Sequence, residues 1–235
     1  IIMSVTITAG DVNKLRQITG AGMMDCKKAL GATGGDFEAA IDYLRKKGQK
    51  VSEKRADRET NEGVVIAVIN NDGSFGTIMG LGCETDFVAK NQAYIDFAKS
   101  ISDVAMANKA ESKEALMAMT MDGITIAEKI AEQVGKIGEK IDITDYALLS
   151  AETVVAYNHS NGKVGVLVAM NKKGEAVETV GKDVTMQIAA MSPIAIDKND
   201  VPEEVKTREM EIGREQARAE GKPEDMVEKI AQGKF

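Results

Sequence analysis

The stretch Cys83–Lys90 reads CETDFVAK and puts an acid and an aromatic ring where a strand-like run ends and a helix begins. Thr85 is a suitable N-cap for that helix, and Asp86 in the first turn suits the positive end of the helix dipole. Phe87 has two interpretations: it packs onto its own preceding hairpin, or it projects outward. A projecting ring beside a carboxylate would suit insertion into a partner's pocket, where the acid would disturb a phosphate or cation site.

Residue types that support enzymatic chemistry are scarce. His159 is the only histidine, and Cys26 and Cys83 do not form a metal-type cluster, so we expect no metal site and two buried, reduced thiols. The chain has no P-loop, G-x-S-x-G or H-E-x-x-H motif. Gly31–Gly35 is glycine-rich but lies between two helical segments, so a phosphate-binding role is disfavoured. The sequence predicts a protein that is not an enzyme and carries no cofactor; a hydrolase that uses scattered carboxylates is the enzymatic alternative.

Two adjacent methionines, Met23 and Met24, form a second unusual feature, in RQITGAGMMDCKKAL. A helix cannot bury both on one narrow stripe, so we expect one to face the helical core and the other to be half exposed. They are either core filler or a flexible apolar contact flanked by Lys27 and Lys28.

The elements that carry these residues begin with three short helices over residues 8–48. Thr8 and Asp36 supply N-terminal caps, the apolar residues recur at helical spacing, and Gly48 is the expected C-terminal stop. Residues 49–61 are nearly all charged or polar and read as a linker or a solvated helix.

Two β-hairpins follow. GVVIAVIN and SFGTIMGLGC flank an Asp72-Gly73 turn, and ETVVAYNHSNGKVGVLVAMN turns at Asn161-Gly162. Lys140–Thr144 alternates like a strand. Both hairpins share an acid, a Val-Val pair and a turn glycine, and a helix follows each. This pattern favours an α+β fold with a duplicated hairpin-plus-helix core, although any two hairpins share some likeness.

Composition sets limits on partners and location. The 235 residues carry a formal charge of −7, with the first 60 mildly basic and the rest acidic, which disfavours direct binding of nucleic acid. No apolar run reaches the roughly 18 residues needed to cross a bilayer, and the opening residues do not resemble a signal peptide. We therefore expect no membrane association.

TGAGMMDCKKAL, TDFVAK and YNHSNGKVGVLVA together resemble the elongation factor Ts family, the guanine nucleotide exchange factors of bacterial and organellar translation. The resemblance runs from Met3 to the end of the chain. It implies an α+β fold with a three-helix bundle like ubiquitin-associated domains. The implied parts are that bundle at 3–48, a charged linker at 49–61, core subdomains at 62–145 and 146–200, and a helical hairpin at 201–235. Family members usually run on past the hairpin to complete the second subdomain. This sequence is either that of a short form or lacks the C-terminal part, and in the second case the second subdomain would be incomplete.

The resemblance also implies a partner, the GTPase elongation factor Tu, and a cytoplasmic location in bacteria, with an organellar origin left open. A dimer or a 2:2 assembly is compatible with it, and a non-exchange adaptor that uses the helical bundle is the alternative function. The residues that match family contact stretches form three groups. They are Met23, Met24 and Lys27 for docking, Thr85, Asp86, Phe87 and Val88 near the magnesium and phosphate site, and Tyr157 and His159 in the second hairpin.

Overall fold

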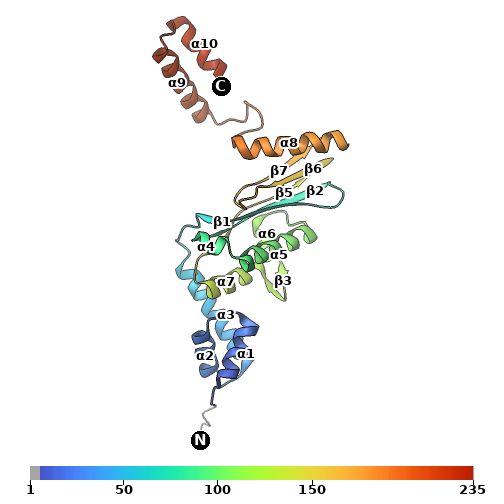
Figure 1. Cartoon of the computed structure of the whole chain (residues 1–235), viewed down its shortest axis with the longest axis vertical. Coiled ribbons are helices and arrows are strands. Elements are labelled where there is room, and N and C mark those ends of the chain that lie inside the picture. Colours follow the sequence, from blue (N-terminus) through green and yellow to red (C-terminus); the bar gives the residue numbers. More distant parts are fainter. Residues whose placement is uncertain (1–5, 235) are drawn as a thin grey trace. The chain divides into compact units, whose positions relative to one another are not determined.

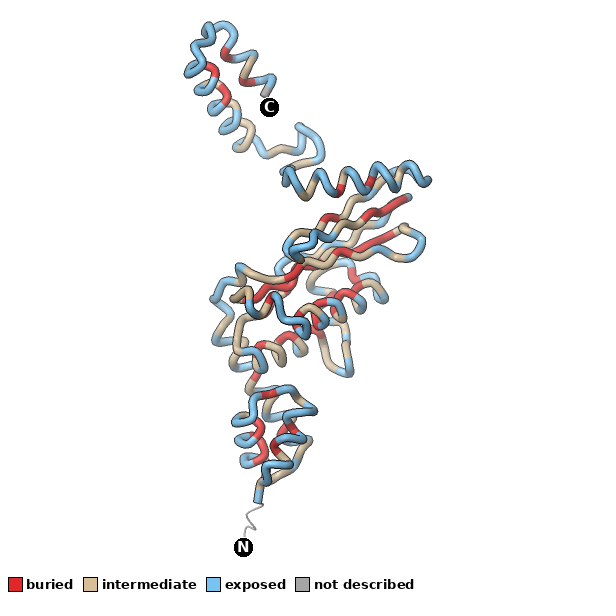
Figure 2. Tube along the Cα trace, in the orientation of Figure 1, coloured by how far each residue is buried: buried red, intermediate tan, exposed pale blue. Residues whose placement is uncertain are grey.

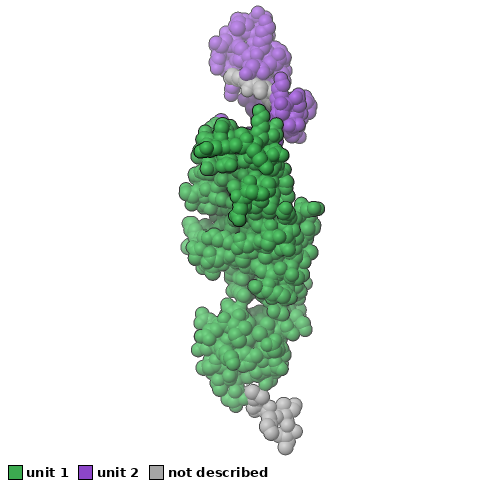
Figure 3. Space-filling model, turned by 90° about the vertical axis from the view of Figure 1, so that its right-hand side faces the viewer, with its two compact units in different colours: residues 1–190 green, residues 191–235 purple. Residues whose placement is uncertain are grey.

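The chain divides into two compact units, residues 1–190 and 191–235, and a computed structural model describes residues 6–234 (Figure 3). The first unit holds N-terminal helices followed by antiparallel β-sheets with helices, and the second holds a helical pair (Figure 1). The expected α+β class is therefore confirmed. Among the described residues, no helix combines the length and the apolar character needed to span a membrane.

The N-terminal helices are α1 (Ala9–Thr19), α2 (Met23–Ala32) and α3 (Phe37–Lys54). The expected caps are formed: Thr8 closes a capping box with Asp11, and the Asp36 carboxylate accepts from the backbone N–H of Ala39 at 3.0 Å. Apolar residues at helical spacing fill the space between the three helices. The fully buried ones are Leu15, Cys26, Ala29, Leu30 and Ala40.

Helix α3 does not stop at Gly48, as the sequence pattern predicted, but continues to Lys54. Gly48 is buried against α7 (Ile126–Ile137), where a Cβ would lie 2.8 Å from the carbonyl oxygen of Ala131. A Cβ on Gly135 would lie 2.8 Å from the Cα of Gly48. The glycine therefore permits a close helix crossing and does not end the helix, and residues 49–54 of the expected linker are helical.

The main sheet has the order β1-β2-β5 and is antiparallel throughout. Its strands are β1 (Glu62–Ile69), β2 (Phe75–Cys83) and β5 (Ile141–Ser150). The first hairpin thus forms as predicted, while the strand expected over 140–144 extends to Ser150 and runs through the expected subdomain boundary at 145.

Helix α5 (Gln92–Asn108) contributes the largest share of helical side chains to the core beside this sheet. Figure 2 shows the buried stretches of the strands and of α5 in red. The core joins Met79 and Leu81 of β2, Tyr94 and Ile101 of α5, and Ile143 of β5. The short elements that complete this part are α4 (Asp86–Ala89), α6 (Lys113–Ala118), β3 (Thr120–Met121) and β4 (Ile124–Thr125).

The second hairpin consists of β6 (Thr153–Asn158) and β7 (Gly165–Met170), which pair with each other, and α8 (Glu175–Met191) follows it. It is tied to β1 through a side chain: the amide of Asn158 accepts from the backbone N–H of Ala67 at 2.8 Å and donates to its carbonyl at 2.7 Å. The Asn158 side chain thus takes the position of a neighbouring strand's backbone.

The second unit contains α9 (Glu203–Ala219) and α10 (Glu224–Lys234), the expected helical hairpin. Gly213 and Ala217 of α9 are buried with Val227 and Ala231 of α10, while Ile212 and Met226 are exposed. Small residues are favoured here because the backbones approach closely: a Cβ on Gly213 would lie 3.2 Å from the Cα of Ala231.

Candidate partner-binding corner

The site is built at the corner where β2 ends at Cys83 and α4 begins at Asp86. Ala89 is buried in the core and Val88 packs against the core at its edge. Phe87 points away from both, and 84% of its surface is exposed. The interpretation in which this ring packs onto its own hairpin is therefore wrong, and the outward interpretation is confirmed.

Asp86, beside the ring, forms an ion pair with Lys90 of the same segment. Its carboxylate accepts a hydrogen bond from the Lys90 ammonium at 2.7 Å, one helical turn further on. The hydrogen bond and charge of Lys90 hold the pKa of Asp86 below its ordinary value, and the same pair raises the pKa of Lys90. The acid is thus ionised at neutral pH, and the charge that the corner presents is a paired one.

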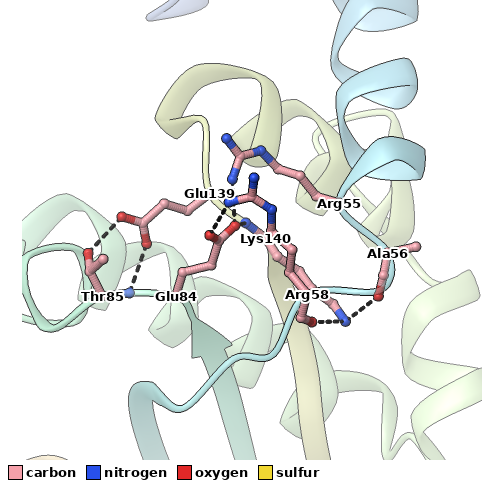
Figure 4. Close-up of polar contacts among 7 residues, drawn as sticks. All are labelled: Arg55, Ala56, Arg58, Glu84, Thr85, Glu139 and Lys140. Atoms are coloured by element: carbon pink, nitrogen blue, oxygen red, sulfur yellow. Dashed lines mark hydrogen bonds and ion pairs between the residues drawn. The ribbon is translucent and has the colours of Figure 1, made fainter.

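Thr85 occupies the N-cap position that the sequence predicted, but its side chain does not make the capping hydrogen bond. The hydroxyl of Thr85 donates to Oε1 of Glu139 at 2.6 Å, and its backbone N–H donates to Oε2 at 3.0 Å (Figure 4). The cap residue is therefore fastened to the loop between α7 and β5.

Glu84 is the centre of a second set of contacts in the same view (Figure 4). It accepts from the backbone N–H of Lys140 at 2.6 Å, from Arg55 at 2.6 Å and from Arg58 at 2.8 Å. Burial by itself raises the pKa of the Glu84 carboxyl, but the Lys140 N–H and the two guanidinium groups outweigh it and bring the pKa to about 2. Lys140 closes the arrangement by donating to the carbonyls of Ala56 and Arg58.

Replacing Glu84 with Gln should lower the free energy of unfolding at pH 7 by about 2 kcal/mol, because hydrogen bonds to a charged group are lost inside a cluster of cations. The folded-state pKa of about 2 lies below the ordinary 4.5, so the carboxylate stabilises the fold above pH 4.5. That contribution disappears as the pH falls from 4.5 towards 2. Urea unfolding at several pH values should therefore show a wild-type advantage that is constant at pH 6–8 and shrinks below about 4.5.

The matched control for this measurement is Glu152→Gln. Glu152 pairs with Lys173 at 3.7 Å on the surface, where such pairs contribute little. Equal stabilities of the Glu84 variant and the wild type at pH 7 would contradict the assignment of Glu84 as the centre of the cluster.

The adjacent methionines lie on the first turn of α2. Met23 is 53% exposed and Met24 62%, so the prediction that one of them faces the helical core is wrong. The core-facing stripe of α2 begins one turn later, at Cys26. Lys27 is exposed beside them.

Tyr157 and His159 lie at the end of β6, where the tyrosine hydroxyl and Nδ1 of His159 are 2.8 Å apart. The described residues thus present three predicted groups on separate elements, namely α2, the corner at α4 and the end of β6. They do not converge on one pocket.

Comparison with known proteins decides the family. The sequence model of the family described as "Elongation factor TS" matches residues 84–235. "Elongation factor Ts" of Cytophaga hutchinsonii is 55% identical over 232 residues, which are 98% of this chain and 84% of the relative. The same-named proteins of Amoebophilus asiaticus and Chlorobaculum tepidum are 53% and 43% identical, over 98% and 97% of this chain and 84% and 82% of their own lengths.

The chain belongs to the elongation factor Ts family. The resemblance carried by TGAGMMDCKKAL and TDFVAK is thereby confirmed. Members of the elongation factor Ts family are exchange factors of translation elongation and not enzymes, in agreement with the catalytic motifs missing from the sequence. Within residues 6–234, no three His, Cys, Asp or Glu side chains gather into a group that would hold a metal ion.

The sequence pattern does not reveal the residues that support the corner. Arg55 and Arg58 belong to the stretch read as a charged linker, and Glu139 and Lys140 look like ordinary surface charges. Glu139 lies 54 positions from Thr85, so no local spacing reveals the contact. The only local signal is the row of charges itself, which is more often a solvated face.

Proposed function

We propose that the chain is the guanine nucleotide exchange factor for elongation factor Tu and acts in the cytoplasm during translation elongation. In this proposal Phe87 and Asp86 enter the GTPase near its magnesium and phosphate site. The observation that carries the proposal is the exposed ring of Phe87 on a corner whose other side is anchored in the core. Membership in the elongation factor Ts family supports it.

The mechanism needs no reacting group. A GTPase holds its nucleotide through amides of the phosphate loop and through Mg²⁺, which demands near-ideal octahedral geometry. An inserted Phe87 ring would hold apart the elements that support the ion. Asp86 would add negative charge where phosphates are already crowded, once the hydrogen bond from Lys90 to its carboxylate is broken. Bound factor and bound nucleotide would then disfavour each other.

This mutual exclusion is a linked equilibrium. If the factor weakens GDP binding by some ratio, GDP weakens binding of the factor by the same ratio. A thousandfold ratio corresponds to about 4 kcal/mol. Burial of one phenylalanine ring contributes about 1.5–3 kcal/mol, and a displaced ion contact supplies the remainder. Cellular GTP refills the emptied site, and the factor leaves unchanged.

Docking is assigned to other surfaces than the corner. Met23, Met24 and Lys27 would contact the GTPase domain, and Tyr157 with His159 would contact another domain of the partner. The exposure of both methionines supports this assignment, because a flexible apolar side chain flanked by a cation adapts well to a partner surface.

Changing Met23 and Met24 together to Ala should raise the factor concentration that gives half-maximal exchange about tenfold and leave the maximal rate unchanged. The reason is that this contact contributes to binding and not to displacement of the nucleotide. Titration of the factor against a fixed amount of partner measures both values. Met186→Ala on α8, which removes a methionine of similar exposure, is the control and should change neither. A lower maximal rate with unchanged half-saturation would contradict the docking role.

The finer architecture is part of the proposal. We assign α1, α2 and α3 to a bundle like ubiquitin-associated domains and the hairpins to a duplicated core. The similar order supports duplication: β1 and β2 precede helices α4 and α5, and β6 and β7 precede α8.

The stoichiometry of the proposed complex with elongation factor Tu is a separate question. Light scattering of that complex would distinguish a 1:1 assembly from a 2:2 one.

The deciding experiment is stopped-flow release of a fluorescent GDP from purified elongation factor Tu with and without the chain. We expect release to accelerate by at least about a hundredfold at saturation. Unaccelerated release would overturn the proposed function, and binding without acceleration would favour a plain adaptor.

A further inference from the structure

Every polar group of Thr85 is engaged within the chain. Its N–H and its hydroxyl both donate to Glu139. Its carbonyl accepts from the backbone N–H of Ala89 at 3.2 Å and from the Cys83 thiol at 3.3 Å. A threonine at an N-cap usually caps its own helix, and here the hydroxyl is given to another segment instead. The polar groups of Thr85 are therefore all directed at its own fold.

Glu139 is well suited to hold that residue because its own position is fixed on both sides. Before it, α7 ends with Gly138 in the left-handed region, and after it the buried Ile141 begins β5. The contacts are also reciprocal. The Glu139 side chain holds the backbone of Thr85, and the side chain of Glu84, next to Thr85, holds the backbone N–H of Lys140, next to Glu139. The two segments are thus joined by crossed carboxylates (Figure 4).

The corner needs this fastening because α4 is only four residues long. Val88 and Ala89 on one side and Cys83 at the end of β2 on the other are anchored in the core, so Glu84 and Thr85 between them are held by polar contacts. Without Glu139, the N–H and the hydroxyl of Thr85 would lose their hydrogen bonds, and only the contacts of its carbonyl would remain. Phe87 would then sample several directions.

We propose that Glu139 is a positioning residue for nucleotide exchange, which acts through Thr85 to fix the direction in which Phe87 is presented. This inference rests on the proposed exchange function. A ring that is already oriented applies its binding energy to the partner's site, whereas a mobile ring loses part of that energy in becoming ordered. The effect falls on the exchange step, because docking uses surfaces away from the corner.

The test is a factor titration with the full chain and fluorescent-GDP-loaded elongation factor Tu. Glu139→Gln keeps the size of the side chain but presents an N–H₂ group to one of the two donors of Thr85. We expect the maximal exchange rate to fall about tenfold while half-saturation stays within about twofold. Asp142→Asn is the matched control. It removes a carboxylate three positions away that pairs only loosely with Lys113, at 3.6 Å, and it should behave as the wild type.

A second pair of variants covers the case in which Glu139→Gln fails to fold, which circular dichroism would reveal. Thr85→Val removes only the hydroxyl and should lower the maximal rate about fivefold, while Thr85→Ser keeps the hydroxyl and should restore it. A merely structural role would lower the melting temperature and leave the maximal rate of the folded fraction unchanged.

The outcomes separate this inference from the proposed function. If the wild type accelerates release, and both Glu139→Gln and Thr85→Val reach the maximal rate of the wild type, the positioning role is overturned and the exchange function stands. If the wild type does not accelerate release, the exchange function is overturned and the positioning role falls with it. A selective loss of maximal rate supports both.

Discussion

Phe87→Ala should lower the maximal acceleration of GDP release about 30- to 150-fold, the range that corresponds to the 2–3 kcal/mol of a hot-spot aromatic. Docking should weaken far less, because the methionines of α2 and the second hairpin keep their contacts. The fold should not change, since the ring is 84% exposed and surface substitutions usually shift stability by less than about 0.5 kcal/mol. Fluorescent-GDP release over a factor titration gives the rate and the affinity from one data set.

The matched control for Phe87→Ala is Ile69→Ala. Ile69 is also an exposed apolar residue, and it lies at the opposite end of the β1–β2 hairpin from the corner. Its loss should affect neither the rate nor half-saturation. A Phe87 variant that retains full acceleration at saturation would remove the wedge from the mechanism, whatever happened to its affinity.

The parts of this fold that were predictable from sequence are those with local causes. Thr8 and Asp36 lie next to the helices they cap, and Asp72-Gly73 lies within the hairpin it turns, so short spacing reveals each of them. The α+β class follows from the sum of such local signals. The exposure of Phe87 was open in the sequence because a ring after a strand is equally consistent with packing inward.

The parts that could not be predicted depend on contacts between distant segments. The fastening of Thr85 by Glu139 and the bond from Asn158 to Ala67 join positions 54 and 91 residues apart. A glutamate that holds a corner and a glutamate in water have the same local pattern. Only the tertiary arrangement distinguishes them.

Gly48 also shows that local sequence patterns can mislead, because they predicted a helix end where α3 continues. A glycine after an amphipathic segment and before a charged one is typical of a helix end. In this chain it lies opposite Gly135, and the two allow α3 and α7 to approach so closely that neither tolerates a Cβ without movement. Helix α3 thereby connects the N-terminal helices to Arg55 and so to the Glu84 cluster.

Gly48→Ala should lower the free energy of unfolding by about 2 kcal/mol, although helix propensity alone predicts a gain of up to about 1 kcal/mol. The added methyl would lie 2.8 Å from the Ala131 carbonyl oxygen, so the two helices must separate. For a unit of this size the melting temperature should fall by about 4–8 °C. The same substitution at Gly31 in α2, where a Cβ meets nothing within 4 Å, should instead raise the melting temperature by a few degrees. Opposite signs from one chemical change would show that the close crossing, and not the flexibility of glycine, determines the stability here. Equal shifts at both positions would mean that α3 and α7 are farther apart in solution than the structure has them.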